Sequence, residues 1–400
     1  MEYRISDRLA ALKPSAIREI FKATDDPSIV PFALGNPAPE SFPVEVIRAF
    51  TKEILDENPV AALQYGITEG YAPLRAALRE RMQAVYACGR EGDDLIVVSG
   101  AQQGAELAAK ALCDEGDTVL CEDPSFIGVL NAFRSLRVNL KGIPLREDGL
   151  DIDALEQALR TEKRVRMLYI IPNFQNPSGI TTSLEKRRAV YALARKYNLL
   201  ILEDNPYGEL RFAGEDLPHI KSLDEDGRVI YLGTFSKILS AGLRVGYVLG
   251  PAPVLQKMVV AKQGEDVHTA MLPQMVAERF LKWEGFAAHL ERVRALYRDK
   301  CGRMLDDIAR YFDPRIAYTT PQGGLFLWCT LPEGIDLLGY CKTAVAKGVA
   351  VVPGVAFLPD TQGKSQSFRL TFAAPSNEQI EQGLRLLGSI PLALSYETPI

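Results

Sequence analysis

One unit recurs along the middle of the chain: a short apolar run, a polar turn and then a helical pattern. The strands predicted from these apolar runs are residues 95–98, 119–121, 166–171, 199–204 and 229–232. Repeated units of this length predict an α/β fold with a mostly parallel central sheet. Ligands of such sheets bind at the carboxyl ends of the strands. The side chains expected at those ends are Ser99, Phe126, Asn176, Asp204 and Ser236.

The turn after the last of these runs brings together three polar groups. Ser236 offers a hydroxyl, Lys237 an amine and Arg244 a guanidinium. Phe235 and Ile238 flank the lysine, and an amine that loses hydration becomes less charged and able to form a Schiff base. Arg244 can hold a phosphate through two parallel hydrogen bonds, with a further donor from Ser236. Taken alone, the pattern also fits a strand-to-loop turn with a surface arginine.

A second anion-binding element is expected where the strand at residues 95–98 turns into a helix, which we expect from Ala105 to Leu112. Backbone N–H groups at the small residues of such a turn can face an anion, in the favourable field of the helix. The same pattern marks any tight strand-to-helix connection, so it supports a phosphate site only together with Arg244. Phe126 can stack on a flat ring or pack into the core, and the sequence leaves both open.

The C-terminal part of the chain predicts a smaller α+β lobe. A long amphipathic helix from Phe286 to Phe312 is expected to bridge the two lobes. Apolar runs and a final helix follow at residues 325–328, 349–352, 368–372 and 377–387. Arg369 interrupts one of these runs, and a buried charge needs a partner, either a structural Asp or Glu or the carboxylate of a substrate.

Length and composition agree with this two-lobed organisation. A chain of 400 residues with 47% hydrophobic content is long enough to bury two cores. We expect residues 1–47 to form an N-terminal arm with part of the small domain. Residues 48–285 would form the large domain, and residues 286–400 the C-terminal small domain.

Charge and residue usage exclude several classes of partner. The net charge of -5 and the lack of Lys/Arg runs argue against nucleic acid. Three scattered histidines, His219, His268 and His289, predict no metal site. Six cysteines without a Cys-x-x-Cys pair indicate a reduced compartment, which we take to be the cytoplasm. The N-terminus lacks the apolar core of a signal peptide, and no apolar stretch approaches about 20 residues, so no membrane association is expected.

Five motifs follow one another along the chain: Ser99-Gly100-Ala101-Gln102-Gln103, Gln175-Asn176-Pro177-Ser178-Gly179, Glu203-Asp204-Asn205-Pro206-Tyr207, Gly233-Thr234-Phe235-Ser236-Lys237 and Arg369-Leu370. In this combination and order they are highly specific. Through them the chain resembles, over essentially its whole length, the fold-type I pyridoxal-phosphate aminotransferases of class I/II. Within these it is most similar to the 2-aminoadipate and aromatic aminotransferase subgroup, which also occurs fused behind DNA-reading domains in bacterial regulators.

The resemblance implies pyridoxal 5′-phosphate as the cofactor and gives each motif residue a role. Lys237 would form the Schiff base, and Asp204 would keep the pyridine nitrogen protonated, so that the ring withdraws electrons from the substrate's Cα. Asn176 and Tyr207 would hydrogen-bond the phenolic oxygen of the ring. The other implied cofactor-binding residues are Phe126 on the ring face, Gly100, Ala101, Gln102, Ser236 and Arg244 at the phosphate, and Ser99.

The resemblance also implies substrate and subunit contacts. Tyr65 is expected to reach the phosphate of a neighbouring subunit, which makes the active unit a homodimer with shared sites. Arg369, Asn176 and the Gly35-Asn36 loop would orient the amino acid through its α-carboxylate. Arg18, on an N-terminal helix that closes over the site, either offers its charge to a side-chain carboxylate or is a solvated surface residue. Ala241 stands where the subgroup usually has proline, and this change removes no reacting group.

We therefore predict an aminotransferase that moves an amino group between an L-amino acid and a 2-oxo acid, through a cycle of pyridoxal and pyridoxamine phosphate. The expected couples are glutamate/2-oxoglutarate with an aminoadipate, aromatic or branched-chain amino acid. A lyase or decarboxylase on the same fold is one alternative. A non-catalytic ligand-sensing domain of a transcription regulator is the other, which is disfavoured because the similarity begins almost at Met1.

Overall fold

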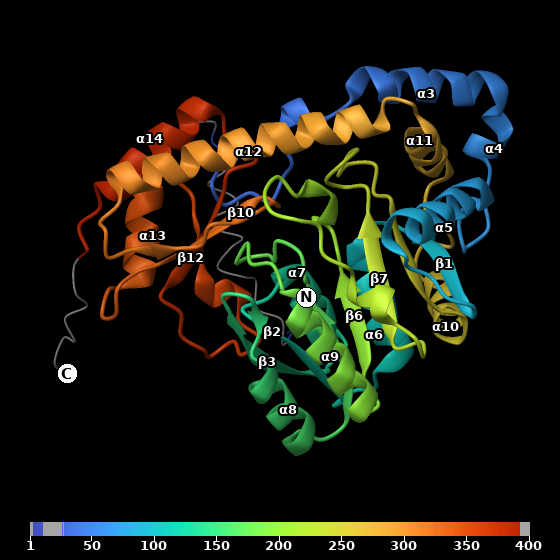
Figure 1. Cartoon of the computed structure of the whole chain (residues 1–400), viewed down its shortest axis with the longest axis horizontal. Coiled ribbons are helices and arrows are strands. Elements are labelled where there is room, and N and C mark those ends of the chain that lie inside the picture. The colour runs from blue at the N-terminus through green and yellow to red at the C-terminus, as the bar shows by residue number, and fades with distance from the viewer. Residues whose placement is uncertain (1–2, 11–25, 27, 393–400) are drawn as a thin grey trace.

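The larger of two sheets has eight strands in the order β1-β8-β7-β6-β5-β2-β3-β4 (Figure 1). The computed structural model describes residues 3–10, 26 and 28–392. The strands are β1 (Asp93–Val98), β2 (Thr118–Asp123), β3 (Asn139–Arg146), β4 (Gly149–Leu150), β5 (Val165–Ile170), β6 (Leu200–Asp204), β7 (Val229–Thr234) and β8 (Gly246–Pro251). The pairs β2/β3, β2/β5, β5/β6 and β6/β7 are parallel, whereas β8 is antiparallel to both β1 and β7. Strands β1 and β7 therefore run the same way, and the predicted mostly parallel sheet is confirmed.

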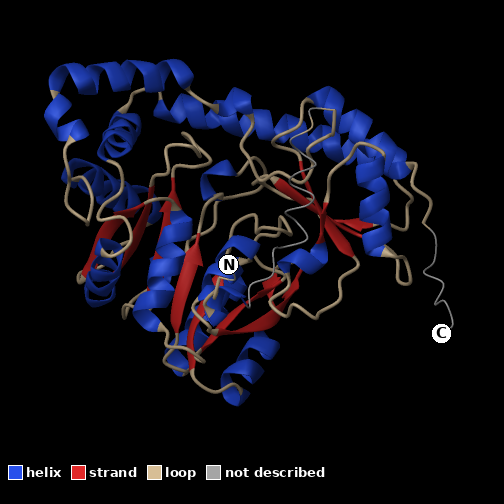
Figure 2. Cartoon of the chain, turned by 180° about the vertical axis from the view of Figure 1, so that it is seen from behind, coloured by secondary structure: helices blue, strands red, loops and turns tan. Residues whose placement is uncertain are grey.

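Helices cover both faces of this sheet (Figure 2). They include α5 (Ala72–Tyr86), α6 (Ala101–Leu112), α7 (Ile127–Ser135), α8 (Ile152–Thr161), α9 (Leu184–Lys196), α10 (Ala252–Gln263) and α11 (Met271–Lys282). Successive residues of one strand belong to different cores: Leu168 packs with the residues of α8 and α9, and Tyr169 with those of α6 and α7. Because side chains alternate across a strand, both faces need apolar residues, which explains the continuous apolar runs.

Helix α6 begins earlier than the sequence predicted. We expected it from Ala105, but its first residue is Ala101 and its N-cap is Gly100, with φ 86°. This positive φ is readily adopted by glycine, so the chain can reverse at once after β1. The polar residues after β1 are therefore part of a helix start rather than of a longer loop.

The smaller sheet has four strands in the order β11-β12-β10-β9 and is antiparallel. Its strands are β9 (Ala317–Tyr318), β10 (Phe326–Thr330), β11 (Val352–Pro353) and β12 (Ser367–Thr371), with helices α13 (Leu337–Ala346) and α14 (Asn377–Gly388). The long helix α12 (Phe286–Tyr311) runs along both lobes, as predicted (Figure 1). The domain boundaries at residues 47/48 and 285/286 remain a prediction, which limited proteolysis would test.

A segment near the N-terminus joins the small lobe. Val30 forms a parallel bridge to Val349, and the backbone N–H of Thr371 donates to the carbonyl of Phe32 at 3.0 Å. The chain then continues through α3 (Val44–Glu57) and α4 (Pro59–Leu63) towards the large lobe. Before them, the described residues include the short α1 (Asp7–Ala10). The small lobe is thus built from N- and C-terminal segments.

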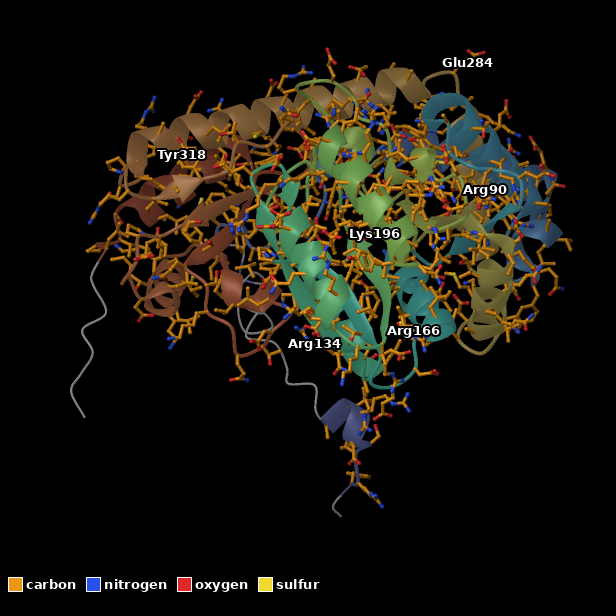
Figure 3. The ribbon with its side chains drawn as sticks, turned by 60° about the horizontal axis from the view of Figure 1, so that its bottom comes forward. Arg90, Arg134, Arg166, Lys196, Glu284 and Tyr318 are labelled. Carbon is orange, nitrogen blue, oxygen red and sulfur yellow. The ribbon has the colours of Figure 1, made fainter. Side chains whose placement is uncertain are left out.

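The outer surface carries charges of both signs. Arg166, Lys196 and Glu284 are exposed side chains from three different parts of the large lobe and its border (Figure 3). Within residues 3–10, 26 and 28–392, no helix combines the length and apolar character needed to cross a membrane.

Candidate active site

A pocket of about 300 Å³ opens at the carboxyl ends of the parallel strands. It is lined by Ala101, Gln102, Phe126, Val129, Ile171, Asp204, Pro206, Tyr207, Thr234, Ser236, Lys237 and Arg244. These residues lie at or beyond the last residues of β1, β2, β5, β6 and β7, and the strands bring them together because their carboxyl ends meet at one edge. Most of the side chains that the sequence predicted for the cofactor therefore share one cavity.

Lys237 supplies the amine of this pocket. Its Nζ donates a hydrogen bond to the carbonyl of Gly35 at 2.9 Å and lies 6.0 Å from the centre of the Tyr207 ring. Phe235 and Ile238 are buried beside it, as expected. Burial lowers the pKa of Lys237 to about 8, and the positive charges of Arg369 and Arg244 add to the shift. A much larger fraction of this amine is neutral near pH 8 than for an ordinary lysine.

This shift gives a testable pH dependence. Only the neutral amine attacks an aldehyde, so attachment of pyridoxal 5′-phosphate to the cofactor-free protein is expected to speed up about tenfold per pH unit below the pKa. Because that pKa is about 8, the rate should level off above it. Stopped-flow absorbance from about pH 6.5 to about pH 10 measures this profile. A rate that keeps rising to the upper end would contradict the lowered pKa.

Asp204, at the end of β6, has one carboxyl oxygen that no group among the described residues binds. The residue is 3% exposed, and Oδ2 accepts a hydrogen bond from the Tyr169 hydroxyl at 2.8 Å. Oδ1 is buried and has no hydrogen-bond partner within the part of the chain that the structure describes. Burial raises the pKa of Asp204 to about 7, and the bond from Tyr169 opposes the shift. A ligand with a cationic N–H group would satisfy Oδ1 and stabilise the charged carboxylate.

Tyr169 was not among the predicted site residues. It lies on β5 within the apolar run that the sequence marked as a buried strand, and it is fully buried. A buried tyrosine usually needs a partner for its hydroxyl, and that was the available signal. The partner is on the neighbouring strand β6, so only the pairing of the two strands identifies it.

Donors for an anion gather around the start of α6. A Cβ atom on Gly100 would overlap the guanidinium of Arg244, and the φ of 86° at this position also favours glycine. Arg244 donates to the carbonyl of Ser99 at 3.1 Å. The hydroxyls of Ser236 and Thr234 lie 2.9 Å apart at the pocket wall, and Thr234 was not predicted. Together with the backbone N–H groups of Ala101 and Gln102 at the start of the helix, these groups are chemically suited to hold an anion.

Other predicted residues do not enter this pocket with their polar groups. The hydroxyl of Ser99 donates to Asp266 at 2.8 Å, and the side-chain amide of Gln102 donates to the carbonyl of Gly128 at 2.9 Å. Tyr65 is 81% exposed and packs edge-on against His268, away from this chain's own pocket. Asn36 is exposed and does not line the pocket, and Arg18 lies outside the described residues.

Arg369, on β12, is buried beside the pocket, with 4% of its surface exposed. It donates to Oδ1 of Asn176 at 2.9 Å and to the carbonyl of Ala33 at 2.6 Å. Its guanidinium lies between two aromatic rings, 4.3 Å from the centre of Phe326 and 5.0 Å from that of Phe357. Burial lowers its pKa to about 10, so the group is charged at neutral pH.

The charge of Arg369 has no carboxylate partner in the described part of the chain. Among these residues, no Asp or Glu forms an ion pair with it, and its Nε is buried without a hydrogen-bond partner. Of the two partners that the sequence left open, a structural carboxylate is therefore not found among the described residues. Asn176 links this arginine to the pocket, since its amide donates a long bond of 3.5 Å to the hydroxyl of Tyr207.

The residues fit pyridoxal 5′-phosphate well. Lys237 offers an amine for the aldehyde, the unpaired oxygen of Asp204 suits the ring nitrogen, and the donors at the start of α6 suit the phosphate. In the described part of the chain, no His, Cys, Asp and Glu side chains gather as they would around a metal ion. The fold and the pocket therefore define a pyridoxal-phosphate enzyme.

Comparison with known proteins identifies its family. The model of the family "Aminotransferase class I and II" matches residues 27–387, and the chain belongs to this family. It is 42% identical over 380 residues to a 2-aminoadipate transaminase of Thermus thermophilus, covering 94% of each chain. It is 39% identical over 390 residues to aromatic-amino-acid aminotransferase 1 of Thermococcus litoralis, covering 96% of this chain and 93% of the relative.

Comparison with solved structures supports the same family. The α-aminoadipate aminotransferase of Thermus thermophilus, complexed with N-(5′-phosphopyridoxyl)-L-leucine, superposes with a TM-score of 0.88 at 41% identity, covering 96% of both chains. The predicted family, fold, cofactor and aminotransferase activity are thus confirmed. Neither the lyase nor the regulator alternative is favoured by these relatives.

Proposed function

We propose that this aminotransferase couples glutamate/2-oxoglutarate with 2-aminoadipate, aromatic or branched-chain amino acids. The main support for an amino acid as substrate is Arg369, a buried arginine without a carboxylate partner among the described residues. A substrate's α-carboxylate would supply that partner. The breadth of the range is supported by relatives named for aromatic amino acids and for 2-aminoadipate, and by a related structure that holds a leucine adduct.

The roles of the site residues follow from their chemistry. When bound, pyridoxal 5′-phosphate supplies a sink for the electrons left on the substrate's Cα. Lys237 holds the cofactor and then takes up and returns the Cα proton, which its lowered pKa favours. Asp204 keeps a proton on the ring nitrogen, and Tyr169 orients that carboxylate.

The remaining contacts hold the cofactor and the substrate in place. Asn176 and Tyr207 would hold the phenolic oxygen of the ring by hydrogen bonds, and Phe126 would pack on the ring. Gly100, Ala101, Gln102, Ser236 and Arg244 would bind the phosphate. Arg369 and Asn176 would bind the α-carboxylate of the substrate, and the Gly35–Asn36 loop would lie beside it, since the carbonyl of Gly35 accepts a hydrogen bond from Lys237.

We propose that the active unit is a homodimer in which Tyr65 reaches the partner's phosphate. Tyr65 lies in an exposed apolar stretch with Val60, Leu63 and Ile67, and such a patch is typical of a surface that another chain covers. Analytical ultracentrifugation at micromolar concentration tests this proposal, and a monomer mass would contradict it.

We also propose a cytoplasmic location, which six cysteines without disulfides support. Cell fractionation tests it.

The substrate range is tested with Arg18→Ala, since Arg18 is proposed to meet a side-chain carboxylate. Loss of the absorbance of lysine-bound cofactor is measured after adding each amino acid. We expect KM for glutamate and 2-aminoadipate to rise roughly 10- to 100-fold, because a charged hydrogen bond is lost, and KM for leucine and phenylalanine to stay the same.

The matched control is Arg8→Ala, which removes an exposed arginine from the neighbouring helix α1. If KM for each substrate were the same in wild type and in Arg18→Ala, Arg18 would have no part in substrate recognition. Product formation without a 2-oxo acid acceptor would instead contradict the aminotransferase cycle itself.

A further inference from the structure

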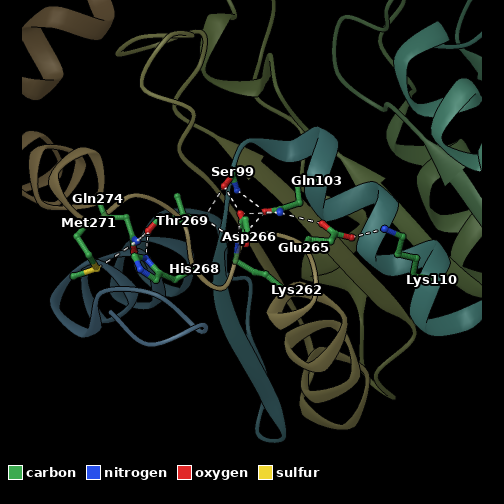
Figure 4. A network of polar contacts seen from close by, with 10 residues as sticks. All are labelled: Ser99, Gln103, Lys110, Lys262, Glu265, Asp266, His268, Thr269, Met271 and Gln274. Atoms are coloured by element: carbon green, nitrogen blue, oxygen red, sulfur yellow. Dashed lines mark hydrogen bonds and ion pairs between the residues drawn. The ribbon is translucent and has the colours of Figure 1, made fainter. Parts of the chain in front are cut away.

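A fully buried lysine outside the pocket lies at the centre of a polar network (Figure 4). Lys262, near the end of α10, is 0% exposed, and its Nζ lies 2.7 and 2.8 Å from the two carboxylate oxygens of Asp266. It also donates to Oε1 of Gln103 at 2.9 Å and to the hydroxyl of Thr269 at 3.1 Å. Burying an ammonium group is unfavourable unless it is paired in this way. The roles proposed above do not account for this arrangement.

Asp266 connects the buried lysine to the start of α6. Its Oδ2 accepts hydrogen bonds from the hydroxyl of Ser99 at 2.8 Å and from Nε2 of Gln103 at 2.9 Å. Oε1 of Gln103 accepts in turn from the backbone N–H of Ser99 at 2.8 Å. Both the side chain and the backbone of Ser99 are therefore fixed by the network (Figure 4).

Fixing Ser99 fixes the residues that face the pocket. Gly100 follows directly, and Ala101 and Gln102 open the helix and line the cavity. The carbonyl of Ser99 also accepts a hydrogen bond from Arg244 at 3.1 Å. A displacement of this turn would move the backbone N–H donors and the guanidinium together. Because such donors act only when aimed at the anion, small displacements weaken binding strongly.

The chain next to Asp266 carries backbone strain. Val267 has φ 65°, a left-handed conformation that is unusual for a β-branched residue, and it is 49% exposed. Because the Val267 side chain is half exposed, its own packing does not explain the strained backbone. Strain of this kind persists where neighbouring contacts determine the backbone, and it clusters at functional sites. Here the bonds of Asp266 and of His268, whose ring contacts the carbonyl of Thr269 at 2.8 Å, hold both sides of the strained residue.

We infer that Lys262 and Asp266 are positioning residues that set the first turn of α6 for the phosphate of the cofactor. This inference rests on the proposed assignment of the phosphate to that turn. Burial opposes ionisation of Asp266, but the hydrogen bonds from Lys262, Gln103 and Ser99 outweigh it and lower its pKa. At neutral pH the carboxylate is therefore an acceptor for all three groups.

The test compares two cofactors that differ only in the phosphate. Cofactor-free Asp266→Asn is titrated with pyridoxal 5′-phosphate and with pyridoxal, and Kd is read from the absorbance of the lysine-bound form. We expect Kd for pyridoxal 5′-phosphate to rise roughly 10- to 100-fold and Kd for pyridoxal to change less than about twofold. Gln103→Leu keeps the charge pair of Lys262 and Asp266, so it should raise Kd for pyridoxal 5′-phosphate by a smaller factor. This second variant provides the test if Asp266→Asn does not fold.

The matched control is Asp224→Asn. Asp224 is also buried and accepts from a fully buried lysine, Lys221, at 2.8 Å, but it lies at the amino end of β7, where it binds the N–H of Val229. This control should lower the melting temperature without changing the ratio of the two Kd values. Equal weakening of both cofactors in Asp266→Asn, or no weakening at all, would overturn the inference. If wild type bound both cofactors equally well, the phosphate assignment would fail instead.

Discussion

Lys237→Ala is expected to lower kcat by about 10⁴-fold or more and to abolish covalent attachment of the cofactor. The amine is the group of the pocket that can both bond to an aldehyde and move a proton at its pKa of about 8. Alanine removes both functions and leaves the carbonyl of Gly35 without its donor. Absorbance of the bound cofactor and steady-state transamination measure the two losses separately.

The control for this variant is Lys196→Ala on α9. Lys196 is an exposed lysine (Figure 3) that pairs with Glu156 at 2.7 Å, and exposed ion pairs contribute little, so its loss should change stability only slightly and leave kcat unchanged. Wild-type turnover in Lys237→Ala would show that another group moves the proton, and would contradict the proposed site.

Asp204→Asn is expected to have the second largest effect, a fall in kcat of roughly 10³-fold. Asparagine keeps the shape of the side chain but carries no negative charge, so it cannot keep a proton on the ring nitrogen of the cofactor. Single-turnover measurements of the first half-reaction report this loss directly. Tyr169→Phe is the graded comparison: it removes one hydrogen bond of 2.8 Å and leaves the charge, so a fall of only about tenfold is expected.

Asp204→Asn should have a different effect, on stability, in the cofactor-free protein. The folded pKa of Asp204 is raised from 3.8 to about 7, so the fold favours the neutral acid. The stability that this group contributes is present below pH 3.8 and is lost as pH rises through about 7. Asparagine has no charge to bury, so cofactor-free Asp204→Asn should be more stable than wild type above pH 7. Melting temperatures that differ equally at all pH values would contradict the shifted pKa.

Local patterns determined much of this protein from the sequence. The long helix begins at Phe286 as expected, and the strand that includes Asp204 ends where predicted, because periodicity and turn residues act over a few positions. Of the five side chains predicted from one rule, that parallel strands end at a common edge, Phe126, Asp204 and Ser236 line the pocket, whereas Ser99 and Asn176 do not. Family, cofactor and reaction followed from the motifs.

Other features were decided only by the tertiary structure. The bond from Tyr169 to Asp204 depends on the pairing of β5 with β6, and the bond from Lys237 to Gly35 joins residues 202 positions apart. That Arg369 meets no carboxylate among the described residues is likewise a matter of packing. The physical reason is common to all of them: composition and spacing specify which polar groups exist, whereas register and side-chain direction decide which of them meet in a buried site and which are left unpaired.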